Sequence, residues 1–134
     1  MRNRSLGSLA LNPELPVLSV YDLAKELAMN NDHDMHHAAL LWRNGKLIRI
    51  GINGHEGARF KRFFVTGPPI SYEAHAETDA LLRAQRGDSL EVMRWLSTGE
   101  LSMSKPCVFC QSRIRQKNLS SVRYTNWQGV WTVL

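Results

Sequence analysis

The first apolar positions along the chain recur at the spacing of one helix face. They are Val20, Leu23, Ala24 and Leu27. Ser19, just before them, is a residue type favoured at the N-cap. The pattern therefore predicts a helix over residues 17–29, which the polar stretch 30–34 ends.

Two short apolar runs follow, over residues 38–42 and 46–52, with Asn44-Gly45 between them. An Asn-Gly pair between two apolar runs is the strongest short-range signal of a β-hairpin. Residues 51–71, which contain Pro68-Pro69, then predict a long loop. A loop of this length in a compact domain is usually functional or mobile.

The second half of the chain predicts two more helices and three more strands. A helical pattern over residues 74–86 stops at Gly87, and another helix runs from Pro106, in its first turn, to about residue 117. The strand candidates are residues 90–96, 122–125 and 130–134. Only residues 126–129 separate the last two strands, so we expect an antiparallel hairpin. The order α-β-β-α-β-α-β-β predicts a layered α/β domain with its helices packed on one sheet.

Length and composition indicate one globular domain. The 134 residues are enough for a single core, and we expect an N-terminal arm over residues 1–16 followed by one domain over residues 17–134. No apolar run approaches the roughly 20 residues that span a membrane, and residues 1–16 lack the apolar stretch of a secretory signal. We therefore expect a cytoplasmic protein with no membrane partner.

The chain carries a net charge of +5 and has an isoelectric point near 9.6. This charge favours anionic partners such as nucleotides or nucleic acid, although many proteins simply carry a solvated positive face. One basic segment is also aromatic, and its residues are Arg59, Phe60, Lys61, Arg62, Phe63 and Phe64. It could form a lid that stacks a base and meets a phosphate, or a surface loop that packs its rings on the core.

The strongest chemical signal is a set of three residues that can bind a metal, His75, Cys107 and Cys110. The only two cysteines share one tetrapeptide, which favours metal or redox chemistry over a structural disulfide. Imidazole and thiolates suit zinc, and three protein ligands leave one position open, as in catalytic zinc sites. The alternative is a structural zinc site with a fourth ligand among His33, His36, His37 and His55.

Glu77 lies two residues after His75, at the start of the same predicted helix. Its carboxylate could reach a water molecule on the open zinc position without being a ligand, and it could pass a proton to a leaving amine. The alternative is a carboxylate that only benefits from the helix dipole. We predict that Glu77 is catalytic.

These residues match the H-x-E…P-C-x-x-C signature of zinc deaminases. They read His75-Ala76-Glu77 and Pro106-Cys107-Val108-Phe109-Cys110. Over roughly residues 17–134 the chain resembles the cytidine/deoxycytidylate deaminase superfamily, and in particular its compact phage and bacterial members. The resemblance implies a three-layer cytidine deaminase-like fold with a five-stranded mixed sheet, Zn²⁺ as the cofactor and a homo-oligomer. It also implies substrate contacts by Ala76 and Pro106.

Residues 51–57, Gly-Ile-Asn-Gly-His-Glu-Gly, resemble the Gly-Tyr-Asn-Gly-x-Pro-x-Gly stretch of dCMP deaminases, with Glu56 in place of proline. The resemblance implies that Asn53 binds the sugar or base of the substrate. Without it, Asn53 would be interpreted as a turn residue. His55 and Phe60, in the same region, are further candidate substrate contacts.

The predicted C-terminal hairpin departs from the dCMP and tRNA adenosine deaminases, whose last two strands are parallel and joined by a helix. It resembles the ending of free-nucleoside cytidine deaminases and some toxin deaminases. We predict conversion of a cytosine-type base to uracil with release of ammonia, on a free cytidine or deoxycytidine nucleotide or nucleoside. The alternatives are deamination of bases in single-stranded DNA or RNA, and a non-catalytic, zinc-stabilised binding module.

Overall fold

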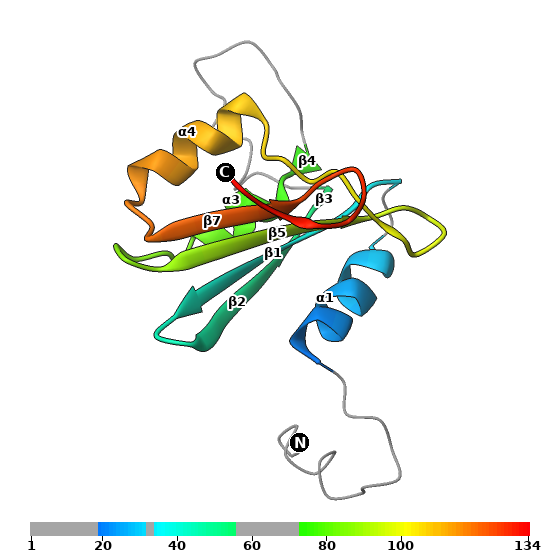
Figure 1. The fold of residues 1–134 in the computed structure, drawn as a ribbon, viewed down its shortest axis with the longest axis horizontal. Coiled ribbons are helices and arrows are strands. Elements are labelled where there is room, and N and C mark those ends of the chain that lie inside the picture. Colours follow the sequence, from blue (N-terminus) through cyan, green and yellow to red (C-terminus); the bar gives the residue numbers. More distant parts are fainter. Residues whose placement is uncertain (1–18, 32–33, 56–72) are drawn as a thin grey trace, which may run out of the picture.

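A computed structural model describes residues 19–31, 34–55 and 73–134 of the chain (Figure 1). Its elements, in chain order, are α1 Val20–Met29, β1 His36–Arg43, β2 Lys46–Ile52, β3 Gly54–His55, β4 Glu73–Ala74, α3 Ala76–Leu81, β5 Ser89–Trp95, β6 Leu101–Ser102, α4 Val108–Gln116, β7 Ser121–Thr125 and β8 Trp131–Val133. The predicted arm over residues 1–16 lies outside the described residues. In the described part of the chain, none of the helices has the length and apolar character needed to cross a membrane.

The central sheet has the strand order β2-β1-β5-β7-β8, and β6 extends it by pairing with the end of β5. β1 pairs antiparallel with β2 and β5, whereas β5 and β7 are parallel. Parallel neighbours need a crossover, and α4 supplies it. β7 and β8 pair antiparallel, with Tyr124 opposite Thr132. The predicted mixed sheet and its C-terminal hairpin are therefore confirmed.

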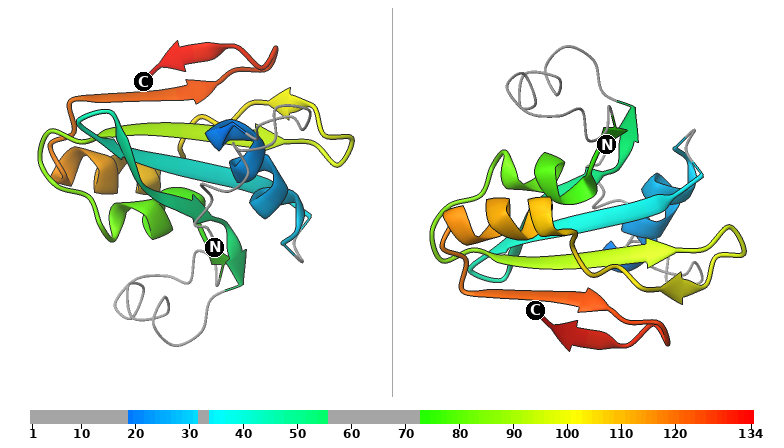
Figure 2. Two further views of the ribbon diagram at one scale, coloured as in Figure 1. Left: turned by 90° about the horizontal axis from the view of Figure 1, so that it is seen from below. Right: turned by 90° about the horizontal axis from the view of Figure 1, so that it is seen from above.

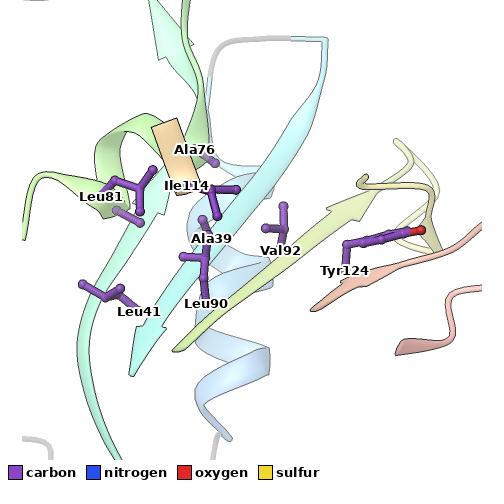
Figure 3. Close-up of a cluster of buried hydrophobic side chains, with 9 residues drawn as sticks. Ala39, Leu41, Ala76, Leu81, Leu90, Val92, Ile114 and Tyr124 are labelled. Atoms are coloured by element: carbon purple, nitrogen blue, oxygen red, sulfur yellow. The ribbon is translucent and has the colours of Figure 1, made fainter. Parts of the chain in front are cut away.

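Helices cover both faces of the sheet, α1 on one side and α3 and α4 on the other (Figure 2). Strand β1 is buried on both faces because its apolar side chains alternate between two clusters. The cluster under α3 and α4 contains Ala39, Leu41, Ala76, Ala80, Leu81, Leu90, Val92, Ile114 and Tyr124 (Figure 3). The cluster under α1 contains Ala24, Ala28, Ala38, Leu40, Met93 and Trp95. These two clusters make the three layers that the sequence predicts.

The first helix and the first hairpin follow the predicted pattern closely. The Ser19 hydroxyl accepts the Asp22 N–H at 3.1 Å, and the Asp22 carboxylate accepts the Ser19 N–H, so a capping box begins α1. Asn44 and Gly45 both have positive φ, at 52° and 77°, as the tight turn between β1 and β2 requires.

Helix α3 is shorter than the predicted helix over residues 74–86. For residues 82–84 each backbone N–H bonds to the carbonyl three residues back rather than four, so the α-helix gives way to a tighter turn. The Asp88 carboxylate then accepts the Gln85 N–H at 2.8 Å. Arg43 on β1 binds the same carboxylate at 2.9 Å. This ion pair holds the chain away from a helical path just before β5.

Two further expectations need correction. Pro106 does not lie in the first turn of α4 but directly before the N-cap residue, Cys107. The predicted loop over residues 51–71 does not begin at Gly51, because β2 continues to Ile52 and β3 pairs with β4. The Phe/Arg segment over residues 59–64 lies outside the described residues.

Candidate active site

The start of α3 and the start of α4 lie on the same face of the sheet and bring the candidate ligands together. His75 is the N-cap residue of α3, and Cys107 is the N-cap residue of α4. The Phe109 ring packs edge-on against the His75 ring, with 6.3 Å between the ring centroids. Two segments that are 32 residues apart in the sequence therefore meet at one point.

The three candidate ligand atoms have the spacing of a zinc tetrahedron. His75 Nδ1 lies 3.3 Å from Cys110 Sγ and 3.7 Å from Cys107 Sγ, and all three atoms lie within 4.8 Å of one another. Zinc bonds of about 2.0 Å to nitrogen and about 2.3 Å to sulfur give nitrogen-to-sulfur edges of about 3.5 Å at tetrahedral angles. The donor set and its spacing therefore fit zinc.

The two cysteines differ in exposure and in acidity. Cys110 is fully buried and Cys107 is exposed. Hydrogen bonds from the Cys110 thiol and from His75 lower the pKa of Cys107 to about 3, and the Cys110 N–H at the helix start also donates to Cys107 Sγ at 3.4 Å. The hydrogen bond to Cys107 and burial raise the pKa of Cys110. Cys107 is therefore the more acidic of the two thiols.

Glu77 lies in the first turn of α3 and is only 5% exposed. Burial, the largest effect, raises the pKa of its carboxyl to about 7. Its carboxylate is not part of the metal-ligand group formed by His75 and the two cysteines. Glu77 is therefore a buried, titratable group beside the candidate ligands.

A cavity of about 210 Å³ opens next to these groups. Five sequence-predicted residues line it, namely Asn53, His75, Ala76, Glu77 and Cys107. Met35, His37 and Lys105 also line it, and no pattern in the sequence singles out Met35. Lys105 could have been chosen from the sequence, because it directly precedes the Pro106-Cys107 pair.

The remaining candidate residues lie elsewhere or beyond the described side chains. Pro106 is buried and is not among the residues that line the cavity, and its carbonyl accepts the Gln111 side-chain N–H at 2.8 Å. His55 belongs to β3, and only its backbone pairing with Glu73 is described. Phe60 lies outside the described residues. Among the described histidines, neither His36 nor His37 joins the metal-ligand group.

Asn53 is 8% exposed, and its side-chain amide is held by three hydrogen bonds. Its Oδ1 accepts the His37 N–H at 2.8 Å and an Asn31 Nδ2–H at 3.0 Å. Its Nδ2 donates to the Met35 carbonyl at 2.9 Å. An amide nitrogen carries two N–H groups, so among the residues that the structure describes one of them remains for a ligand in the cavity that Asn53 lines.

The polar network continues from Asn31 to helix α1. Asn31 Oδ1 lies 2.9 Å from His36 Nδ1, which also lies 3.0 Å from the Ala28 carbonyl in the last turn of α1. A carbonyl oxygen can only accept, so His36 Nδ1 carries the proton. The C-terminal end of α1 is thereby tied to the wall of the cavity.

The chain matches no protein-family model, and no curated protein matches it. Two crystal structures of dCMP deaminase from the cyanophage S-TIM5 are similar to it. The apo form is 22% identical, with a TM-score of 0.50 over 76% of this chain and 82% of that chain. The form in complex with dCMP and dUMP is 23% identical, with a TM-score of 0.53 over 78% of this chain and 74% of that chain. The chain therefore has the cytidine deaminase-like fold of these dCMP deaminases.

Proposed function

We propose that this chain is a zinc-dependent hydrolytic deaminase that converts a cytosine-type base to uracil and releases ammonia. One observation carries the proposal: His75, Cys107 and the buried Glu77 line one cavity, and Cys110 Sγ lies within 4.8 Å of the ligand atoms of His75 and Cys107. The cytidine deaminase-like fold supports it. His75 Nδ1 and the two cysteine sulfurs would hold the metal. A bound zinc ion would supply an activated water molecule by lowering its pKa.

Glu77 would move protons between water, base and leaving group. A carboxyl whose pKa is about 7 changes protonation state easily near neutral pH, which suits a general acid and base. Its carboxylate would take a proton from the water that adds to the base and give it to the ring nitrogen. It would then carry the second proton from the added hydroxyl group to the departing amine, so that the C–N bond breaks and ammonia leaves. Because Glu77 is not a candidate ligand, it is free for this role.

Asn53 would orient the substrate. Its remaining Nδ2–H is a donor for a carbonyl or hydroxyl oxygen of the base or sugar. Ala76 would contribute its backbone at the start of α3. These roles are supported by the shared cavity for Asn53 and Ala76.

A free pyrimidine nucleotide or nucleoside is the first candidate substrate. The cavity of about 210 Å³ suits one base with its sugar. The similar phage enzyme was crystallised with dCMP and dUMP, which supports a mononucleotide. A base in single-stranded DNA or RNA is the second candidate, because a larger groove of about 760 Å³ shares Lys105 with the cavity.

The alternative to catalysis is a non-catalytic, zinc-stabilised binding module, and we also propose that the chain forms a homo-oligomer. The buried Glu77 beside the ligand group favours catalysis over a binding module. A second copy of the chain could cover Trp127 and Val130 on the β7–β8 hairpin, which are 66% and 57% exposed.

The direct test is mass spectrometry of products from zinc-loaded protein. The panel contains cytidine, deoxycytidine, their monophosphates, and short single-stranded DNA and RNA. We expect uracil-containing product from at least one of them. In Glu77→Gln, which keeps the shape of the side chain, we expect turnover to fall by roughly 10²- to 10⁴-fold with unchanged zinc content. A panel without product, or unchanged turnover in Glu77→Gln, would contradict the proposal.

A further inference from the structure

Lys105 stands at the mouth of the candidate active-site cavity. It directly precedes Pro106 and Cys107, its side chain is exposed, and it lines the cavity together with Glu77 and Asn53. Among the described residues that line this cavity, it is the only lysine or arginine. A positively charged side chain beside a cavity of this size favours binding of an anionic group of the ligand.

Lys105 also lines a second, larger hollow, a groove of about 760 Å³ between α4 and the β7–β8 hairpin. Gln111 and Arg115, one turn apart on α4, and Asn118, just after its C-terminal end, are polar residues that line this groove. Ile114, Val122 and Tyr124 are the apolar part of its lining. No aspartate or glutamate of the described chain lines the groove. The groove and the cavity therefore share one positively charged residue, Lys105.

We propose that Lys105 binds a phosphate group of the substrate and makes the site select a nucleotide over a nucleoside. This inference rests on the proposed function and specifies its substrate class. The cavity has room for a base and its sugar, so a phosphate attached to that sugar extends to the cavity mouth, where Lys105 stands. The groove beyond Lys105 leaves room for that phosphate, whether it ends a mononucleotide or continues a strand.

The charge of Lys105 can be tested by equilibrium binding, without turnover. Isothermal titration of zinc-loaded Glu77→Gln protein measures the dissociation constants of deoxycytidine and dCMP. We expect dCMP to bind about tenfold to hundredfold more tightly than deoxycytidine, as a charge-assisted hydrogen bond would give. Adding Lys105→Gln removes this difference and leaves deoxycytidine binding unchanged, whereas adding Lys105→Arg keeps most of it.

Lys117→Gln is the matched control. It removes the same charge from the C-terminal end of α4, but Lys117 lines a small cavity beside Leu81 and Leu82, away from the candidate site. Equal affinities for dCMP and deoxycytidine, no binding of dCMP, or equal effects of Lys105→Gln and Lys117→Gln would overturn the proposal. Phosphate-dependent binding without turnover in the wild-type protein would keep the phosphate site and remove the deaminase. Turnover without phosphate-dependent binding would support the deaminase and contradict the phosphate site.

A short single-stranded oligonucleotide with one cytosine distinguishes the two sources of the phosphate. If the strand follows the groove, Arg115→Gln weakens binding of the oligonucleotide several-fold and leaves dCMP unaffected. If the phosphate belongs to a mononucleotide, dCMP binds at least as tightly as the oligonucleotide, and Arg115→Gln changes neither. Both results support Lys105 as the phosphate ligand if Lys105→Gln also weakens binding of whichever ligand, dCMP or the oligonucleotide, binds more tightly.

Discussion

The orientation of the Asn53 amide is fixed by backbone groups whose hydrogen-bonding roles cannot change. The His37 N–H can only donate, so it must face Asn53 Oδ1, and the Met35 carbonyl can only accept, so it must face Asn53 Nδ2. Asn31 reinforces the arrangement, because its Nδ2 donates both to Asn53 Oδ1 and to the Asn53 carbonyl. Asn31 is therefore a positioning residue for a side chain that lines the cavity.

Replacing Asn31 by alanine removes two hydrogen bonds to Asn53, one to its side-chain oxygen and one to its carbonyl, so the Asn53 amide becomes less ordered. We expect KM to rise several-fold, with a smaller change in kcat, because substrate orientation weakens while Glu77 and the ligands are untouched. In nuclear magnetic resonance spectra the Asn53 side-chain N–H signals should broaden or shift and exchange faster with water. This second readout does not depend on turnover.

Asn30→Ala is the control for this variant. Asn30 is the exposed C-cap residue of α1 and lies directly before Asn31. It should leave both the kinetics and the Asn53 signals unchanged. If Asn31→Ala behaves like Asn30→Ala, Asn31 has no positioning role.

At this scale the sequence predicts the residues whose chemistry depends on local spacing. His75, Glu77 and the two cysteines could be chosen because each lies within one of two short motifs at helix starts. His37 could be named from the sequence only as an alternative zinc ligand, because only the pairing of β1 with its neighbours brings it to the cavity. Hydrogen bonds such as Asn31 to Asn53, 22 residues apart, have no signature in the order of residues.

The packing of α3 on β2 depends on a missing side chain. A Cβ atom at Gly51 would lie 2.3 Å from the Ala76 carbonyl oxygen and 2.6 Å from the Ala80 nitrogen. Both are backbone atoms of the helix that carries Glu77, so they cannot move aside without moving the helix. Glycine at this position thus sets the depth at which α3 sits over the sheet.

Gly51→Ala should therefore force α3 away from β2. We expect a loss of stability of about 2 kcal/mol or more, as for overpacked cores, together with weaker zinc binding because His75 moves with the helix. Urea denaturation and zinc competition with a chelator measure the two effects. Gly54→Ala is the control, since a Cβ there meets nothing within 4 Å. Equal stability of both variants would show that α3 is not held as tightly as the structure indicates.

Helices and strands whose apolar residues recur at a clear spacing could be predicted from the sequence, and the shortest strands could not. The capping box of α1 and the Asn-Gly turn are local signals, and both are present. β3, β4 and β6 each contain two residues, too few for any periodicity, and exist only because a partner strand lies alongside. The early end of α3 likewise depends on Arg43, which is distant in the sequence.

Across the whole molecule, a polar network fills part of the sheet face that α1 shares with the last hairpin. β7 and β8 are joined by residues 126–130 alone, with no helix between them to cover this face. The buried Glu91 carboxylate accepts the Tyr21 hydroxyl at 3.0 Å and the Trp42 ring N–H at 2.8 Å, and Arg123 binds it as well. The Arg123 guanidinium in turn lies 4.2 Å from the Trp131 ring centroid. Each donor comes from a different element, so the network ties α1, β1, β5 and β7 together.

On the opposite face, zinc would join α3 to α4, since His75 belongs to one helix start and both cysteines to the other. Metal-binding energy then becomes folding energy. We expect EDTA to lower the Tm of zinc-loaded protein by about 15 °C when zinc is present at about 1,000 times its Kd. Cys107→Ala should have the low Tm with or without zinc, whereas Glu77→Gln, which changes no candidate ligand, should keep the full shift. Scanning calorimetry with and without EDTA measures this, and an identical Tm in both conditions would contradict a metal-linked fold.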